Sequence, residues 1–307
     1  MDSGSSDDSV SAAARDGTSV VELEIPPDFT AARARNAGLA KLLAENPGLE
    51  FFQTVDGDCE IDGDWMAAGL SALRAEPDLG GVFGRLHERY PDRSVYNAIC
   101  DDDWNVPVGE VTILGGVALL RVSAFREVGL YNATMIAGEE PDLAMRMRGC
   151  GWRLRRIDAA MGFHDVDITS FSQWCTRTRR TGHAYAELAH RYPDGRAPNW
   201  PRTALSIVFW GGGMPLALAL SVVLACFAGS YWWIVAALLF LVWPIRMLQI
   251  AKAKFARGLP IKVCFAAGAT IMIGKIPQLF GLLEYHRNRV IGRRSRIIEH
   301  KSPPKTL

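Results

Sequence analysis

The chain has 307 residues, 49% of them hydrophobic and 22% charged, which is enough for one large α/β domain and a further part. Its six cysteines are scattered without a C-x-x-C pair, which argues against a disulfide framework or a zinc site and favours a reducing compartment. Residues 1–150 hold 12 Lys+Arg against 26 Asp+Glu, and residues 151–307 hold 22 against 7. A basic half beside apolar sequence predicts an anionic membrane surface as partner, and we expect no nucleic-acid partner.

The chain begins with a polar, turn-forming run, "DSGSSDD", at residues 2–8. Gly accepts positive φ, and Asp and Ser side chains bond to nearby backbone N–H groups, so this run favours a tight loop. Such a loop usually follows a strand, and no strand precedes this one in the sequence.

Short apolar runs then alternate with helical patterns up to residue 200. The predicted elements are strands at 19–25 and 50–55, helices at 29–46 and 64–76, and a strand, turn and strand within 110–125. This alternation favours an α/β fold with a mostly parallel sheet and helices on both faces. In such sheets, ligands bind beyond the carboxyl ends of the strands.

A first group of carboxylates follows the second predicted strand. Asp56 and Asp58 stand on either side of Gly57, and two carboxylates at a strand end suit a divalent cation, Mg²⁺ or Mn²⁺, that also holds phosphate oxygens. An Asp-x-Asp after a strand is more often a turn or a helix cap, so both interpretations stay open. Asp62 and Asp64 fit the second one, since Asp64 comes directly before a helical pattern.

A second group opens a later helix. Glu139, Glu140 and Asp142 begin a helical pattern that ends near Cys150 and Gly151. The helix dipole favours carboxylates in a first turn, which accounts for them without any function. The order of motifs raises the functional interpretation: Asp-x-Asp after a strand, Gly-Glu-Glu about 80 residues later, then Gly-Trp and a strand.

This ordered set resembles family 2 glycosyltransferases of the GT-A fold, over about residues 2–200. "FTAARARNAG" is similar to the family's Ala-Arg-Asn-x-Gly helix, "VDGD" to its Asp-x-Asp, and "GEEPDLAMRMRGCGW" to its Gly-Glu-Asp-x-x-Leu-x-x-Arg segment. "FSQWCTRTRRTGHAYAE" is similar to the Gln/Trp/Arg-rich segment near the acceptor. The apolar C-terminal part and "RSRIIEHK" resemble bacterial enzymes of exopolysaccharide assembly.

The opening run resembles the Val-Asp-x-Gly-Ser-x-Asp turn that ends the second strand of this family. The resemblance therefore implies an N-terminally incomplete transferase domain, whose first strand, helix and second strand are missing. A sheet without them exposes backbone N–H and C=O groups and loses part of the wall around the nucleobase. We expect the natural reading frame to begin upstream.

The resemblance also implies roles for single residues. Asp2 is expected to contact the nucleobase, Arg35 the nucleotide, Asp56 the ribose or metal shell, and Asp58 the cation. His164, which follows the Gly-Trp strand, resembles a metal-ligand His of some members. A lone His at a strand end is nonetheless more often structural.

Glu140 stands where the family has its catalytic Asp, with Glu139 as the alternative. The residues implied at the acceptor are Gln173, Trp174, Arg177 and Arg180. The implied reaction moves a sugar from a nucleotide-sugar donor to a lipid-linked or glycan acceptor. A cation neutralises the departing diphosphate, and a carboxylate takes the proton of the acceptor hydroxyl, which inverts the anomeric configuration.

Between Arg202 and Arg246 lie 43 residues without a charge. At about 1.5 Å per residue this is roughly 64 Å of helix, about twice the thickness of the hydrocarbon core, so we expect a transmembrane hairpin with its turn at residues 229–231. Lys and Arg flank both ends and are absent from the turn. Both ends are therefore expected in the cytoplasm, with the catalytic domain on the cytoplasmic side of a bacterial inner membrane.

A third apolar stretch, residues 263–283, is interrupted by Lys275 and Pro277 and followed by arginines. We expect it to lie in the cytoplasmic interface, although a third span remains open. The arginines before the hairpin include Arg177 and Arg180. They could bind the phosphates of a lipid-linked acceptor, or they could be the positive residues that ordinarily flank a membrane helix on its cytoplasmic side, and the two interpretations are about equally good. The expected domains are the transferase domain at 1–200, the hairpin at 201–250 and a basic interfacial tail at 251–307.

Two rival functions use the same residues. The first is an inactive, membrane-anchored protein that binds nucleotide sugars without turnover. The second is a metal-dependent phosphohydrolase that uses Asp56 and Asp58 and releases phosphate from simple esters. The intact later motifs favour the transferase over both.

Overall fold

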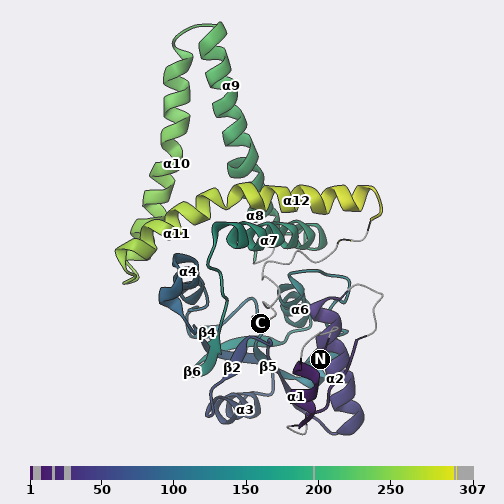
Figure 1. Cartoon of the computed structure of the whole chain (residues 1–307). Helices are drawn as coiled ribbons and strands as arrows, with labels where there is room; N and C mark the ends of the chain where they lie inside the picture. The colour runs from purple at the N-terminus through teal and green to yellow at the C-terminus, as the bar shows by residue number, and fades with distance from the viewer. Residues whose placement is uncertain (3–7, 16–17, 24–28, 196–197, 294, 296–307) are drawn as a thin grey trace. The chain divides into compact units, whose positions relative to one another are not determined.

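The structure, a computed structural model, describes residues 1–2, 8–15, 18–23, 29–195, 198–293 and 295 (Figure 1). Most of the opening "DSGSSDD" and of "RSRIIEHK" lies outside these residues. The chain forms two compact units. The first consists of Met1–Arg89 with Trp104–Asp165, and the second of Tyr90–Asp103 with Val166–Leu307.

A single sheet forms the centre of the first unit. Its strands are β1 Phe51–Thr54, β2 Cys59–Ile61, β3 Leu79–Glu88, β4 Gly109–Glu110, β5 Ala118–Arg121 and β6 Arg153–His164. Their order is β1-β5-β3-β6-β2, and β4 pairs with β6. Among the strand pairs of the described residues, β3 with β6 is parallel and the others are antiparallel. The prediction of a mostly parallel sheet is therefore wrong, because β5 inserts between β1 and β3 and runs antiparallel to both.

Helices cover both faces of this sheet, as the sequence predicts. They are α2 Ala31–Glu45, α3 Trp65–Ala75, α5 Val122–Glu127 and α6 Glu139–Gly149, and the same unit also contains the short helix α1 Ser9–Arg15. Successive residues of β5 point to opposite faces. Leu119 packs with Trp65 of α3, whereas Leu120 joins Phe125 of α5 and Leu143 of α6 in the other core. The predicted α/β class and the helices at 29–46 and 64–76 are confirmed.

The strand predicted at 19–25 is reduced, within the described residues, to an isolated parallel bridge between Asp2 and Glu22. The strand, turn and strand predicted within 110–125 correspond to β4, a loop and β5. There the second strand ends at Arg121, and α5 begins at the next residue.

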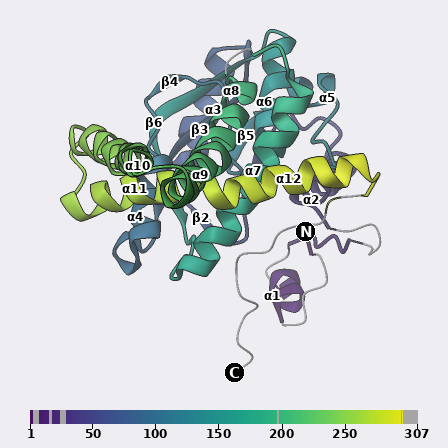
Figure 2. The ribbon, with the colours of Figure 1, turned by 90° about the horizontal axis from the view of Figure 1, so that it is seen from above.

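The second unit is helical. Its elements are η1 Pro91–Arg93, α4 Val95–Asp103, α7 Phe171–Arg191, α8 Trp200–Val208, the π-helical turn η2 Phe209–Gly213, α9 Met214–Phe227, α10 Trp232–Phe255, α11 Ile261–Ile273 and α12 Lys275–Val290. Within it, α9 and α10 run side by side as a hairpin, and α11 and α12 lie across the base of that hairpin (Figures 1 and 2). The segment 166–200, predicted as part of the transferase domain, groups here with the C-terminal helices.

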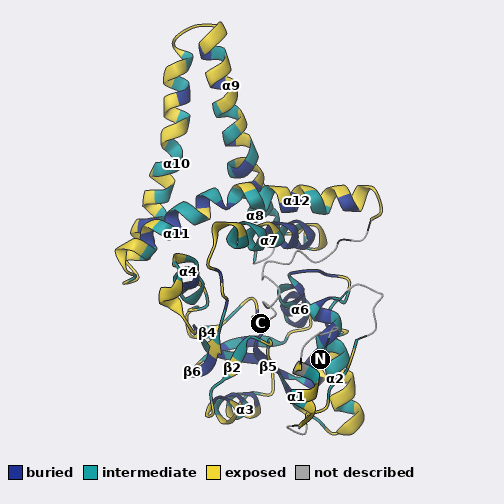
Figure 3. Ribbon diagram, viewed as in Figure 1, coloured by how far each residue is buried: buried dark blue, intermediate teal, exposed yellow. Residues whose placement is uncertain are grey.

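Among the residues that the structure describes, three helical stretches are long and apolar enough to cross a membrane: Trp200–Phe227, Trp232–Phe255 and Ile261–Val290. Large apolar side chains along α9 and α10 are exposed, for example Leu216, Phe227 and Ile234 (Figure 3). Exposed apolar surface of this extent is what a lipid environment would cover.

Helices α7 and α12 approach each other through glycines. A Cβ atom on Gly281 would lie 1.9 Å from the carbonyl oxygen of Arg179, and one on Gly182 would lie 2.0 Å from that of Gln278. Backbone-to-backbone contact of this kind requires residues without a side chain, as at close crossings of membrane helices. Gly211 of η2 makes the same kind of contact with the backbone of Lys275.

Candidate active site

Arg35 of α2 lies at the centre of a group of carboxylates in the first unit. Its guanidinium donates hydrogen bonds to Asp56 Oδ1 at 2.7 Å, to Glu140 Oε1 at 2.8 Å and to Glu139 Oε1 at 3.1 Å. Asp56 follows β1, and the two glutamates begin α6. Three motifs that are far apart in the sequence therefore meet at one side chain, which we call the Arg35 cluster.

The charges of the cluster hold Arg35 in its ionised form. Burial alone lowers the pKa of this guanidinium, but the attraction of Glu140 and Asp56 outweighs burial and raises the pKa above its usual range. The ring of Tyr131 lies 5.5 Å from the guanidinium carbon, and burial raises the pKa of the Tyr131 hydroxyl. Arg35 is thus a fixed positive charge among carboxylates.

Local hydrogen bonds hold the helix that carries Arg35 in position beside the carboxylates. Thr30 caps α2, since its Oγ1 accepts from the backbone N–H of Arg33 at 3.1 Å. The Asn36 amide donates to the carbonyl oxygen of Tyr131 at 2.8 Å and accepts from the N–H of Tyr131 at 3.0 Å. The Ala-Arg-Asn segment therefore fixes both the helix and the loop that faces it.

Two glycines allow the Arg35 cluster to form, one by leaving space and the other by its backbone conformation. A Cβ on Gly116 would lie 2.7 Å from Asp56 Oδ2, 2.8 Å from Arg35 Nη2 and 3.2 Å from Glu140 Oε1. Gly138, immediately before α6, has φ of 85°, a left-handed conformation that glycine adopts without strain. This reversal brings the first turn of α6 to Arg35.

Asp58, Cys59 and His164 form a second group, which we call the metal-ligand group, with one ligand atom of each within 4.8 Å of the others. Asp58 Oδ1 lies 3.2 Å from His164 Nε2 and 3.8 Å from Cys59 Sγ. Strand pairing explains the group, because Cys59 of β2 and His164 of β6 are direct cross-strand partners. The residues offer oxygen, nitrogen and sulfur donors, which fit a divalent metal ion.

The surroundings hold this group in place. The ring of Trp104 stacks on His164, with centroids 4.6 Å apart and planes 23° apart. Burial, together with the nearby charges of Asp56 and Asp58, raises the pKa of the Cys59 thiol to about 12. The imidazole therefore has a fixed plane, and the thiol keeps its proton at neutral pH.

The two aspartates predicted to share a cation have different partners in the structure. Asp56 is paired with Arg35, and Asp58 with His164. Both carboxylates are partly exposed, at 39% and 32% of their side-chain surface. Asp64 occupies the N-cap position of α3 without a capping hydrogen bond from its side chain.

Asp2, predicted at the nucleobase, is half-buried in the isolated bridge near the N-terminus. Its N–H donates to the carbonyl oxygen of Val21, and its own carbonyl oxygen accepts from the N–H of Leu23, both at 2.9 Å. The backbone of Asp2 is thus fixed, and its role at a nucleobase stays a prediction.

The predicted acceptor residues lie on α7 in the second unit. Gln173 forms a capping box with Ser170, in which each side chain bonds to the backbone N–H of the other residue. Trp174 stacks on Tyr96 of α4, with centroids 5.8 Å apart. Arg177 and Arg180 are partly exposed on the same helix. Gln173 therefore has a structural task, whatever it contacts in addition.

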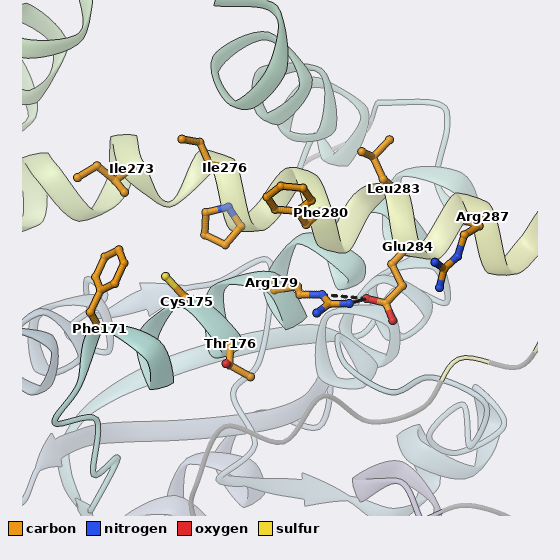
Figure 4. A pocket seen from close by; sticks show the side chains of 11 residues that line it. Phe171, Cys175, Thr176, Arg179, Ile273, Ile276, Phe280, Leu283, Glu284 and Arg287 are labelled. Atoms are coloured by element: carbon orange, nitrogen blue, oxygen red, sulfur yellow. Dashed lines mark hydrogen bonds and ion pairs between the residues drawn. The ribbon is translucent and has the colours of Figure 1, made fainter. Parts of the chain in front are cut away.

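A groove of about 890 Å³ runs between α7 and the C-terminal helices of the second unit (Figure 4). Its walls are mainly apolar, with Phe171, Ile276 and Phe280 among them. Arg179 of α7 and Glu284 of α12 form an ion pair at 2.6 Å along the groove (Figure 4). Arg287, three residues after Glu284 on α12, also lines the groove. The groove is lined by Arg179 rather than by the predicted Arg177 and Arg180.

The structure adds Cys59, Trp104, Gly116 and Tyr131 to the residues predicted from sequence. Cys59 directly follows the Asp-x-Asp and carries a sulfur atom that can bind a metal, so the sequence alone could have indicated it as a metal ligand. Gly116 sits in a Gly-Gly pair before an apolar strand, a weaker signal of close backbone approach. Trp104 and Tyr131 reach the site only through the fold.

No protein-family model matches the chain. The pre-mycofactocin glycosyltransferases of two strains of Mycobacterium tuberculosis are 29% identical to it over 180 residues, 54% of the chain. The chain matches only 36% of the length of these curated relatives. Among solved structures, a mannosyltransferase from Pyrobaculum calidifontis, in complex with GDP-Man and Mn²⁺, covers 92% of this chain and 76% of its own, with 17% identity and a TM-score of 0.53.

These comparisons confirm the predicted GT-A-like fold and the resemblance to glycosyltransferases. The structural similarity supports the fold alone, because the identity is 17%. The sequence similarity is independent of it and points to the same class of proteins.

Proposed function

We propose that this GT-A-like chain, a relative of glycosyltransferases, is an inverting, metal-dependent family 2 glycosyltransferase that uses a nucleotide-sugar donor. The observation that carries the proposal is the Arg35 cluster, which joins the two glutamates of α6 to Asp56, two residues before Asp58 of the metal-ligand group. A sugar transferase of this kind needs two groups close together: a cation site that binds the diphosphate and a carboxylate that accepts the proton of the acceptor hydroxyl.

Asp58 and His164 would hold the divalent cation, Mg²⁺ or Mn²⁺. When bound, the cation would neutralise the charge that grows on the departing diphosphate. The bound Mn²⁺ of the mannosyltransferase structure is in line with this expectation. Asp56, paired with Arg35, would face the ribose or the metal shell.

Glu140 is the better candidate for the general base. Its side chain is 17% exposed, whereas that of Glu139 is 5% exposed. A base must reach the acceptor hydroxyl and return its proton to solvent, so the more accessible glutamate suits the task. The hydrogen bond from Arg35 would orient its carboxylate.

The acceptor is proposed to be lipid-linked or a glycan, brought to the protein at the membrane. The apolar groove supports a lipid-linked acceptor, because an apolar wall stands beside Arg287 and beside Arg179, which is paired with Glu284. The relatives' name adds pre-mycofactocin as another acceptor to test. Exopolysaccharide assembly remains the expected setting of a lipid-linked acceptor.

The protein is proposed to lie in the bacterial inner membrane, with its catalytic unit in the cytoplasm. The uncharged turn between α9 and α10 and the basic residues at the other end of α10, Lys252 and Lys254, support this orientation. The crosswise position of α11 and α12 within the second unit supports an interfacial rather than a spanning role for them.

The proposal is tested with the full chain in membranes. A panel of nucleotide sugars that includes GDP-mannose would be offered with lipid-linked sugars, a polysaccharide or pre-mycofactocin. Sugar transfer that requires Mn²⁺ or Mg²⁺ and stops with EDTA is expected. Donor binding without transfer to any acceptor would favour the inactive binding protein, and phosphate release from simple esters would favour the phosphohydrolase.

A further inference from the structure

We propose that Cys59 is a third ligand of the cation site, and that it strengthens the binding of Zn²⁺ or Cd²⁺ much more than the binding of Mg²⁺ or Mn²⁺. The inference rests on the proposed metal role of Asp58 and His164 and extends it. It assigns a sulfur donor, and with it a metal preference, to a site that otherwise offers oxygen and nitrogen.

The distances fit coordination by all three side chains. Zinc bonds of about 2.0–2.3 Å in a tetrahedral arrangement place donor atoms roughly 3.3–3.8 Å apart. Asp58 Oδ1 already lies 3.2 Å from His164 Nε2 and 3.8 Å from Cys59 Sγ. All three donors lie within 4.8 Å of one another, so closing the set requires a movement of about 1 Å or less.

The sheet keeps these donors together. Cys59 and His164 face each other across the β2–β6 pair. Two residues before His164, Gly162 adopts a φ of 147°, and a Cβ there would lie 1.9 Å from the carbonyl oxygen of Glu60. The close approach of the two strands therefore depends on this glycine. Stacking by Trp104 fixes the plane of the His164 imidazole.

Sulfur changes which ions the site favours. Thiolates bind borderline and soft ions such as Zn²⁺ and Cd²⁺ well, whereas Mg²⁺ and Mn²⁺ prefer oxygen. On binding, the S–H bond breaks, a sulfur–metal bond forms, and the proton passes to solvent. A hard cation would use Asp58 and His164 and leave the thiol protonated. Zn²⁺ and Mn²⁺ would therefore compete for the same two residues.

The test uses the full, metal-free chain in detergent micelles. Cd²⁺ is added stepwise, and the ultraviolet charge-transfer absorption of a thiolate–Cd²⁺ bond is followed. The wild type should show this band, and Cys59→Ser should lose it. Cys150→Ser, which removes an exposed thiol elsewhere in the first unit, is the matched control and should keep the band. A band that survives Cys59→Ser, or that disappears in Cys150→Ser, overturns the inference.

A second measurement separates loss of the ligand from loss of the fold. Cys59→Ser should weaken Cd²⁺ binding by about tenfold or more while Mn²⁺ binding, measured by the electron paramagnetic resonance of free Mn²⁺, stays within about threefold. If Cys59→Ser weakened the binding of Cd²⁺ and of Mn²⁺ by the same factor, the proposed preference would be contradicted.

The two proposals fail in different ways. A band that depends on Cys59 in a protein without transferase activity would refute the proposed function and leave the sulfur ligand standing. Transfer that requires Mn²⁺ in a protein without the band would refute the sulfur ligand alone.

Discussion

Asp58 and Asp56, two residues apart, have different pairing partners in the candidate site. Asp58 pairs with His164 at the metal-ligand group, and Asp56 pairs with the fixed charge of Arg35. The sequence predicted both as cation ligands, because spacing along a strand end cannot tell which neighbour each carboxylate meets. The local motifs placed Arg35, Asp56 and Glu140 correctly in their elements. Their meeting, and the pairing of Cys59 with His164, depends on the sheet.

We predict that Asp58→Asn lowers kcat/KM for sugar transfer by about a hundredfold or more, because the neutral amide binds a divalent cation poorly. The rate of transfer in isolated membranes is the measurement. Asp62→Asn is the matched control, since Asp62 lies in the next turn, outside the metal-ligand group. Normal transfer by Asp58→Asn would show that the metal is held elsewhere.

The two glutamates of α6 should separate under substitution. Glu140→Gln is expected to lower kcat by about 10²–10⁴-fold with little change in thermal stability, because the amide keeps the hydrogen bond of Arg35 but cannot take a proton. Glu139→Gln, at a buried position, should reduce kcat much less. Steady-state kinetics of both variants decide the assignment, and the reverse order of effects would move the base to Glu139.

At the scale of elements, helices were predicted better than strand directions. Helical periodicity and capping residues are local, so the helices at α2, α3 and α6 follow from the sequence. The direction of β5 is set by its partners: the chain passes through α4 and β4 before β5 enters between β1 and β3. Nothing in "VALL" itself encodes that choice. Similarly, the glycines of α7 and α12 were unremarkable in sequence and mark a close crossing only in the fold.

The crossing of α7 and α12 gives a prediction at this scale. Gly281→Ala should destabilise the second unit by about 1–3 kcal/mol, since its Cβ would overlap the backbone of Arg179. Gly213→Ala is the control, because the nearest contact of its Cβ would be an ordinary 3.8 Å. Thermal unfolding in detergent compares them, and equal melting temperatures would show that α12 does not depend on this contact.

His183 of α7 predicts a pH dependence. Burial lowers its pKa to about 4, while the nearby Glu284 acts weakly in the other direction. Its ring meets the ring of Tyr285, and its Nε2 lies 2.9 Å from Ser295 Oγ. Because the unfolded chain takes up this proton near pH 6.5 and the folded one only near pH 4, stability falls as the pH drops from about 6.5 to 4, by up to about 3 kcal/mol.

The variant His183→Gln should remove this part of the pH dependence. The difference in melting temperature between variant and wild type, measured at pH 7 and pH 4.5, isolates it from the other titrating groups. A difference that does not change with pH would mean that His183 is not buried in solution.

At the scale of the whole molecule, charge patterning predicted a membrane hairpin, and the structure contains three stretches of sufficient length. Length and apolar composition decide whether a helix is able to cross. They do not decide whether it does, because α11 and α12 combine an apolar stretch with basic residues at its end. The number of crossings is therefore a matter for topology experiments.

We predict that Ser230→Cys, in the turn after α9, is labelled by a membrane-impermeant maleimide in intact cells, whereas Ile291→Cys, just after α12, is labelled only after the cells are opened. Both side chains are exposed in the structure. Labelling of Ile291→Cys from outside would establish a third crossing and refute the interfacial position of α12.

The short helix α4 is joined by ion pairs to the end of the apolar helix α10. It leaves the sheet unit after β3 and belongs to the helical unit, where its nearly buried Asp102 pairs with Lys254 and with Arg257 at 2.8 Å, at the end of α10. Without the C-terminal helices this carboxylate would lose both cationic partners and its side chain would be exposed to water. The end of α10 and the helix α4 therefore share one set of charges, although more than a hundred residues separate them in the chain.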